Sequence, residues 1–187
     1  MYSDIIEKRK VSEFRKLRSK WTEIKEEHSY VLTFYEYSKA ELNIIIAKEA
    51  QKLKINDVFK EDEKKTQKKQ NSVFEEDSTK EIFRKAARMS HPDIADEKKI
   101  NEFKELVVAK KENHLNKLLD IADQFNIKNC EISYDQIDLI QQEIDDSIKD
   151  IQKMMNSIYW IWHTASEKQK TIILKNIISN LKNEQKK

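Results

Sequence analysis

His91 and Asp93 are the residues of this chain best suited to chemistry, an imidazole and a carboxylate on either side of the only proline among 187 residues. Both groups are common in active sites. A catalytic triad would also need a serine or cysteine beside a positioned base, and the sequence marks no such residue. The chain has no glycine, which excludes a glycine-rich phosphate loop. We therefore expect no enzymatic activity and no cofactor.

A basic helix leads into this tripeptide. Ser78 and Glu81 have the spacing of a capping box, which predicts a helix that begins at Thr79. Pro92 ends it at about Ser90, because the residue before a proline is excluded from the helical region. Ile82, Phe83 and Ala86 share one face. The other face carries basic side chains and leads to the turn: Lys80, Arg84, Arg88 and His91.

A second helix is expected after the turn, from an N-cap at Asp96 to about Lys111. Two helices joined by a short loop are most simply antiparallel neighbours. Phe83 and Ala86 would then face apolar residues of the second helix, namely Phe103, Leu106 and Ala109. His91-Pro92-Asp93 would be exposed at the tip.

Residues 78–127 resemble a divergent, truncated J-domain, the module of DnaJ-type co-chaperones. The resemblance is carried by Phe83 to Asp93 and by Phe103 to Ala109 of the next helix. It implies that a basic face docks on an acidic surface of a DnaK-type ATPase and that the loop triggers ATP hydrolysis there. Matched residue by residue, the docking face is Lys80, Arg84, Lys85 and Arg88, and the triggering loop is His91, Pro92 and Asp93.

A structural interpretation stands beside this one. Pro92 with its neighbours could simply stop a helix, and Arg84, Lys85 and Arg88 could be an ordinary solvated face. The tripeptide alone favours that interpretation, whereas the two flanking helices favour the J-like one.

The flanks are helical and resemble coiled-coil segments. Apolar residues recur at helical spacing from Val11 to His28 and again from Leu42 to Leu53, which predicts two amino-terminal helices. Ser133 caps a helix predicted to reach His163 with an apolar stripe from Ile137 to Trp162. Ser166 caps a final helix. The expected organisation is an amino-terminal helical region (1–58), a charged linker (59–77), the J-like domain (78–127) and a carboxyl-terminal helical hairpin or coiled coil (128–187).

The aromatic run Tyr159, Trp160 and Trp162 is the second conspicuous cluster. Neighbouring side chains on a helix point about 100° apart, so the run cannot face one core. Its residues are candidates for an interface, and core packing within a helical hairpin is the simpler interpretation.

The apolar stripe from Ile137 to Trp162 also needs a partner. We expect it to be covered by the amino-terminal helices, by another copy of the chain or by a different protein.

Composition favours an all-α fold, because 37% of the residues are charged, glycine is absent and proline occurs once. The sequence contains no run of 18 apolar residues, so we expect no membrane span, and we recognise no signal peptide. A single cysteine, Cys130, fits a reducing cytoplasm. Three scattered histidines give no metal site: His28, His114 and His163.

Three functions remain open. The preferred one is a co-chaperone or adaptor that recruits a DnaK-type ATPase to a client bound by the flanks. The second is a structural or assembly subunit, in a virion if the complex is viral, and a homo-oligomer is possible. The third is nucleic-acid association through Lys64, Lys65, Lys68 and Lys69, although the net charge of +2 argues against nucleic acid as a partner of the whole chain.

Overall fold

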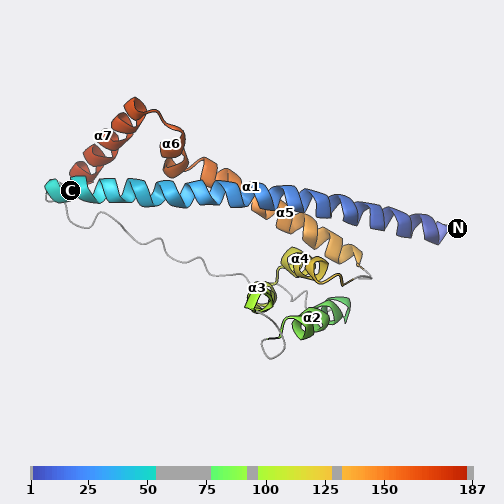
Figure 1. The fold of residues 1–187 in the computed structure, drawn as a ribbon. Helices are drawn as coiled ribbons and strands as arrows, with labels where there is room; N and C mark the ends of the chain where they lie inside the picture. Colours follow the sequence, from blue (N-terminus) through green and yellow to red (C-terminus); the bar gives the residue numbers. More distant parts are fainter. Residues whose placement is uncertain (1, 54–76, 92–96, 128–131, 185–187) are drawn as a thin grey trace. The chain divides into compact units, whose positions relative to one another are not determined.

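A computed structural model describes residues 2–53, 77–91, 97–127 and 132–184 (Figure 1). Within these residues the chain forms helices and no strands, which confirms the all-α prediction. None of the described helices combines the length and apolar character that a membrane span requires. The helices are α1 (Tyr2–Lys52), α2 (Asp77–Met89), α3 (Glu97–Glu112), α4 (Leu115–Gln124), α5 (Tyr134–Met155), α6 (Ile158–Thr164) and α7 (Glu167–Glu184).

The chain divides into two compact units. Unit 1 comprises residues 1–24 and 67–146, and unit 2 comprises residues 25–66 and 147–187. Each unit combines an amino-terminal and a later stretch, because α1 and α5 each contribute to both units. The sequence-based ranges were contiguous segments instead. Most of the predicted linker, together with Asp96 and Cys130, lies outside the described residues.

Helix α1 is a single helix of 51 residues, so the prediction of two separate amino-terminal helices was wrong. No proline or glycine interrupts the stretch between His28 and Leu42. That prediction treats the apolar residues up to His28 and those from Leu42 as two separate groups. Trp21 of unit 1 and Val31, Ser38 and Leu42 of unit 2 are all buried and follow one another at helical spacing, so one face of α1 is buried through both stretches.

In unit 1, α2 and α3 contact each other and both contact α4. The His91 ring lies 5.8 Å from the Phe103 ring, and the Lys110 ammonium lies 4.6 Å from the centre of the Phe83 ring. These contacts join the end of α2 to the first half of α3 and the middle of α2 to the last turns of α3. The buried core includes Ile82, Ala86, Leu106, Ala109, Leu118, Leu119 and Ile121.

Two helix ends in unit 1 use asparagine where many proteins use glycine. Asn113 and Asn126 have φ angles of 59° and 53°. After α3, the His114 amide donates to the Ala109 carbonyl at 2.9 Å, and after α4 the Ile127 amide donates to the Ala122 carbonyl at 2.9 Å. Both are Schellman turns, which need a left-handed residue after the last helical turn. Asparagine supplies this conformation in a chain without glycine.

The helix predicted from Ser133 to His163 is divided. Its start is confirmed, because the Ser133 amide donates to Gln136 Oε1 at 2.9 Å and the Gln136 amide to Ser133 Oγ at 3.1 Å. However, α5 ends at Met155, and Ser157 caps the short helix α6 by accepting from the Trp160 amide. The predicted continuous helix was therefore wrong beyond Met155, since a serine able to cap a new helix interrupts the stripe.

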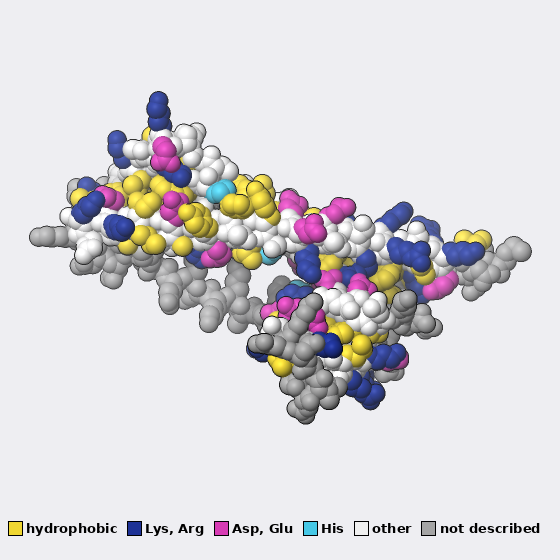
Figure 2. All heavy atoms as spheres, in the orientation of Figure 1, with side chains coloured by type: hydrophobic (Ala, Val, Ile, Leu, Met, Phe, Trp, Pro, Cys, Tyr) yellow, Lys and Arg dark blue, Asp and Glu magenta, His cyan; other side chains and the backbone are white. Residues whose placement is uncertain are grey.

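Unit 2 has its own core, in which Leu42 and Ile46 of α1 pack with Trp162 of α6. Partly buried residues from α7 pack against this cluster: Ile173, Leu174, Ile177 and Leu181. Figure 2 shows hydrophobic side chains over α6, α7 and the carboxyl-terminal half of α1. The predicted cap of α7 is confirmed, because the Ser166 amide donates to Gln169 Oε1 at 2.8 Å.

We predict that Asn126→Val destabilises the protein, whereas Asn126→Gly does not. A β-branched residue is strained in the left-handed region, where a non-glycine residue already costs about 1–2 kcal/mol. The midpoint of urea unfolding measures the change. Asn101→Val is the matched control, because Asn101 is also exposed but lies within α3. Equal effects of the two valine substitutions would contradict this explanation of the turn.

Candidate functional site

The exposed face of α2 carries the predicted docking residues. Thr79, Ile82, Ala86 and Ser90 are buried on one side of the helix. Arg84 and Arg88 are exposed, one turn apart, on the other side. The helix is therefore amphipathic as predicted, and its two guanidinium groups are presented to solvent.

The other two basic residues are placed differently. Lys85 is exposed, and its ammonium lies 2.6 Å from Glu81 Oε1 on the next turn. The hydrogen bond from Lys85, followed by its charge, lowers the pKa of the Glu81 carboxyl below its ordinary value. Glu81 is therefore ionised at neutral pH and offsets the charge of Lys85. Lys80 is half-buried.

His91 is the one residue of the expected triggering loop within the described residues; Pro92 and Asp93 lie outside them. Its imidazole is exposed and makes the edge contact with Phe103 of α3. The chain after α2 is therefore held to α3 through an aromatic pair. Ser90 stabilises the end of α2, since its hydroxyl donates to the Ala86 carbonyl at 2.8 Å.

The aromatic cluster of unit 2 faces several directions. Trp162 is buried, and its indole N–H donates to Glu41 Oε2 at 2.7 Å. Tyr159 lies edge-on to Tyr35 at 5.4 Å. Trp160 is half-buried and lies 5.5 Å from the His163 ring. Trp162 thus packs within the chain, and a role of Tyr159 and Trp160 in an interface stays a prediction.

A buried carboxylate that sequence reasoning missed lies between α4 and α5. Glu143 is only 9% exposed. Its Oε1 accepts from the Leu115 amide at 2.6 Å, and its Oε2 accepts from the amide and side chain of Asn116 at 2.9 and 2.8 Å. The two amides belong to the first turn of α4, where backbone N–H groups have no carbonyl acceptor within the helix. Glu143 therefore caps α4 from another helix.

The same network reaches α1. The Arg18 guanidinium donates to the Asn116 side chain at 3.1 Å and to Asp120 and Asp123 at 2.7 and 2.9 Å. The Trp21 indole N–H also donates to Asp120, at 3.2 Å. The signal in the sequence was the place of Glu143 beside Ile140 and Ile144, on the apolar side of its helix. This arrangement satisfies buried polar groups of α1, α4 and α5.

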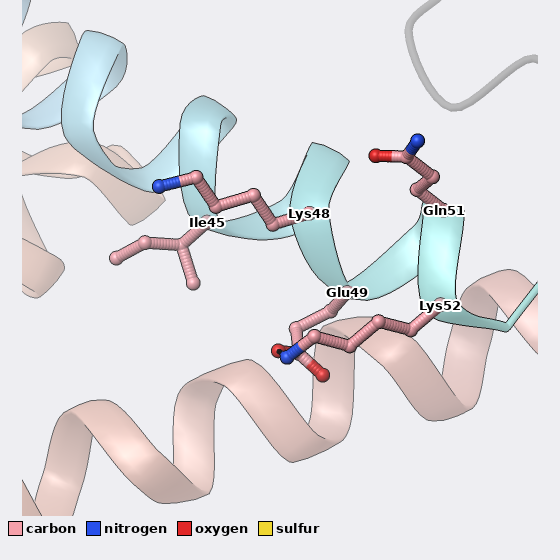
Figure 3. Close-up of a pocket in the computed structure, with 5 residues that line it drawn as sticks. All are labelled: Ile45, Lys48, Glu49, Gln51 and Lys52. Atoms are coloured by element: carbon pink, nitrogen blue, oxygen red, sulfur yellow. Dashed lines mark hydrogen bonds and ion pairs between the residues drawn. The ribbon is translucent and has the colours of Figure 1, made fainter.

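Two shallow surface hollows lie along α1. One of about 480 Å³ is lined by Glu7, Lys8, Val11, Ser12, Arg15 and Lys16. The other, of about 320 Å³, is lined by Ile45, Lys48, Glu49, Gln51 and Lys52 (Figure 3). The described residues that line each hollow all belong to α1. Among the described residues, no group of three or more histidine, cysteine or acidic side chains could hold a metal ion.

The histidines considered for metal binding lie apart from one another in contacts of another kind. His28 Nε2 lies 3.1 Å from Asp150 Oδ2, and His163 packs against Phe34 with ring centres 4.5 Å apart. His114 precedes α4, with its Nδ1 3.8 Å from Glu143 Oε1. No family model, curated protein or solved structure matches the chain significantly.

We predict that Glu143→Leu destabilises unit 1 by about 3 kcal/mol, because two amides and the Asn116 side chain lose a buried acceptor. Glu143→Gln keeps one carbonyl oxygen and costs less. Gln142→Leu is the matched control, since Gln142 is the exposed neighbour on the same helix. Urea unfolding followed by circular dichroism measures the difference. A Glu143→Leu protein as stable as the Gln142→Leu protein would show that this cap contributes little.

Proposed function

We propose that the chain is a J-domain-like co-chaperone or adaptor that recruits and stimulates a DnaK-type ATPase. The observation that carries the proposal is the outward position of Arg84 and Arg88 on α2, whose opposite face is buried. His91 follows these residues and contacts α3. The basic face and the loop residue therefore belong to one packed helix pair, as the proposed mechanism requires.

The expected electrostatics fit this function. Exposed guanidinium groups attract an acidic partner through a screened field and raise the rate of encounter. Arg84 and Arg88 supply this field more effectively than Lys85, because Glu81 offsets the lysine charge at 2.6 Å. Asp93 acts at the partner ATPase in this proposal, so the chain needs no catalytic residue of its own.

A structural or assembly subunit is the second candidate function, and the continuous α1 favours it. A helix of 51 residues that contributes to two units is typical of a scaffold. If the wild-type protein stimulates none of the cognate DnaK-type ATPases, that result would favour this candidate. The nucleic-acid alternative depended on Lys64, Lys65, Lys68 and Lys69, which lie outside the described residues.

We predict that the wild-type protein accelerates single-turnover ATP hydrolysis by a cognate DnaK-type chaperone. His91→Gln or Asp93→Asn should abolish the acceleration, because each removes a group of the triggering loop. Circular dichroism checks that both variants keep their helices. Equal stimulation by the wild type and both variants would reject the proposed mechanism.

The docking face makes a separate prediction. Arg84→Glu with Arg88→Glu should weaken chaperone binding at least about tenfold and reduce its dependence on salt. Reversal of Lys104 and Lys111, two exposed lysines of α3, is the matched control. Glu81→Gln should strengthen binding slightly, because it removes the negative charge beside the face. Titration calorimetry at two salt concentrations measures these changes, and equal losses from both reversed pairs would indicate a non-specific charge effect.

A further inference from the structure

An exposed stripe runs along the part of α1 that belongs to unit 2. Tyr30, Tyr37 and Ile44 recur every seven residues and are 59%, 66% and 55% exposed. Small exposed residues lie three positions after each of them: Thr33, Ala40 and Ala47. This is the spacing of the a and d positions of a coiled coil over two and a half heptads. We call these six residues the α1 stripe.

The α1 stripe is not the side of α1 that packs within unit 2. The buried residues of this stretch are Val31, Ser38, Leu42 and Ile46. At about 100° per residue, they lie on the opposite side of the helix from the stripe. The Tyr30 ring lies 4.6 Å from the Phe34 ring of the same helix, yet more than half of each large stripe residue stays exposed. Large apolar side chains at heptad spacing usually pack against another helix.

The order of large and small residues shows which helix fits. If a second copy of α1 runs antiparallel, Tyr30 lies opposite Ala47 of the other chain, Tyr37 opposite Ala40, and Ile44 opposite Thr33. Each layer then pairs one large side chain with one small one, as close packing of two helices requires. A parallel copy in register would instead place Tyr30 against Tyr30 and Ala40 against Ala40.

The flanking polar residues fit the same antiparallel register. Glu27 and Lys48 lie beside the stripe at equivalent heptad positions, and both are exposed. Lys48 lies apart from the Glu49 and Lys52 ion pair in Figure 3. In the antiparallel pair, Glu27 of each copy faces Lys48 of the other. Glu26 and Gln51 continue the stripe at its two ends and meet each other, so a polar layer closes each end of the contact.

We propose that the α1 stripe is the contact surface for a second copy of this chain, which binds antiparallel to form a symmetric dimer. The contact extends over about 26 Å of helix from residue 30 to residue 47. It is distinct from the apolar residues of α5, of which Ile140, Ile144 and Ile151 are buried within the chain. The proposal does not depend on the co-chaperone function, because the docking residues belong to unit 1 and the stripe to unit 2.

Sedimentation equilibrium of the full chain tests the surface. The wild type should show a monomer–dimer equilibrium, and Ile44→Lys should raise the dissociation constant at least about tenfold. Ile172→Lys of α7 is the matched control, because Ile172 is an isoleucine of similar exposure, 58%, away from the stripe. It should leave the equilibrium unchanged. A wild type that stays monomeric at high concentration, or a dimer broken by Ile172→Lys and not by Ile44→Lys, would overturn the proposal.

Charge exchange and cross-linking test the register. Glu27→Lys and Lys48→Glu should each weaken the dimer, and the two together should restore it, because the charges exchange places. In a Cys130→Ser background, chains carrying Tyr30→Cys should form disulfides with chains carrying Ala47→Cys. Tyr30→Cys chains alone should not, since their cysteines lie about 26 Å apart along the helix axis. Disulfides between two Tyr30→Cys chains would instead show a parallel contact.

Discussion

The hydrogen bonds from the first turn of α4 to the Glu143 carboxylate support the rest of unit 1. A helix begins with amides that lack partners, and His114, at the N-cap of α4, makes no side-chain cap. The Glu143 carboxylate of α5 is the acceptor for these amides, so α4 is fixed against α5. Because α2 and α3 both pack on α4, this cap supports the position of α2, which also accepts a buried hydrogen bond at Thr79 Oγ1 from the Gln136 side chain of α5 at 2.8 Å.

The absence of glycine from the chain shapes its turns and its helices together. Left-handed residues are needed at the ends of α3 and α4, and asparagine supplies both of them. Elsewhere a lack of breakers lets α1 continue for 51 residues. The same composition therefore gives one very long helix and a tightly turned group of short ones. The absence of glycine therefore affects both the turns after α3 and α4 and the length of α1.

Local signals in the sequence predicted the fold better than distant ones. The capping residues Ser133 and Ser166 act within one helical turn, and both were identified correctly. The start predicted at Thr79 from a cap at Ser78 was wrong, because α2 begins two residues earlier, at Asp77. The continuity of α1 was missed, because the stretch between His28 and Leu42 was left out of the pattern. Val31 and Ser38 continue the buried face there. At the candidate site, the exposure of Arg84 and Arg88 followed from helical spacing alone. The cap by Glu143 could not be predicted in the same way, because its donors lie 27 and 28 residues away in sequence.

The two proposed surfaces have a joint consequence for an adaptor. A dimer formed through the α1 stripe carries two basic α2 faces, since each copy contributes its own unit 1. When two binding modules are linked, the second binding event occurs at an effective concentration set by the linkage, and the total affinity rises without new contacts. In the proposed function, a single face with two exposed guanidinium groups would bind weakly by itself, because exposed charges are screened. Self-association is therefore the physical route by which so small a docking face would hold a chaperone or a multivalent assembly, provided that both faces engage at once.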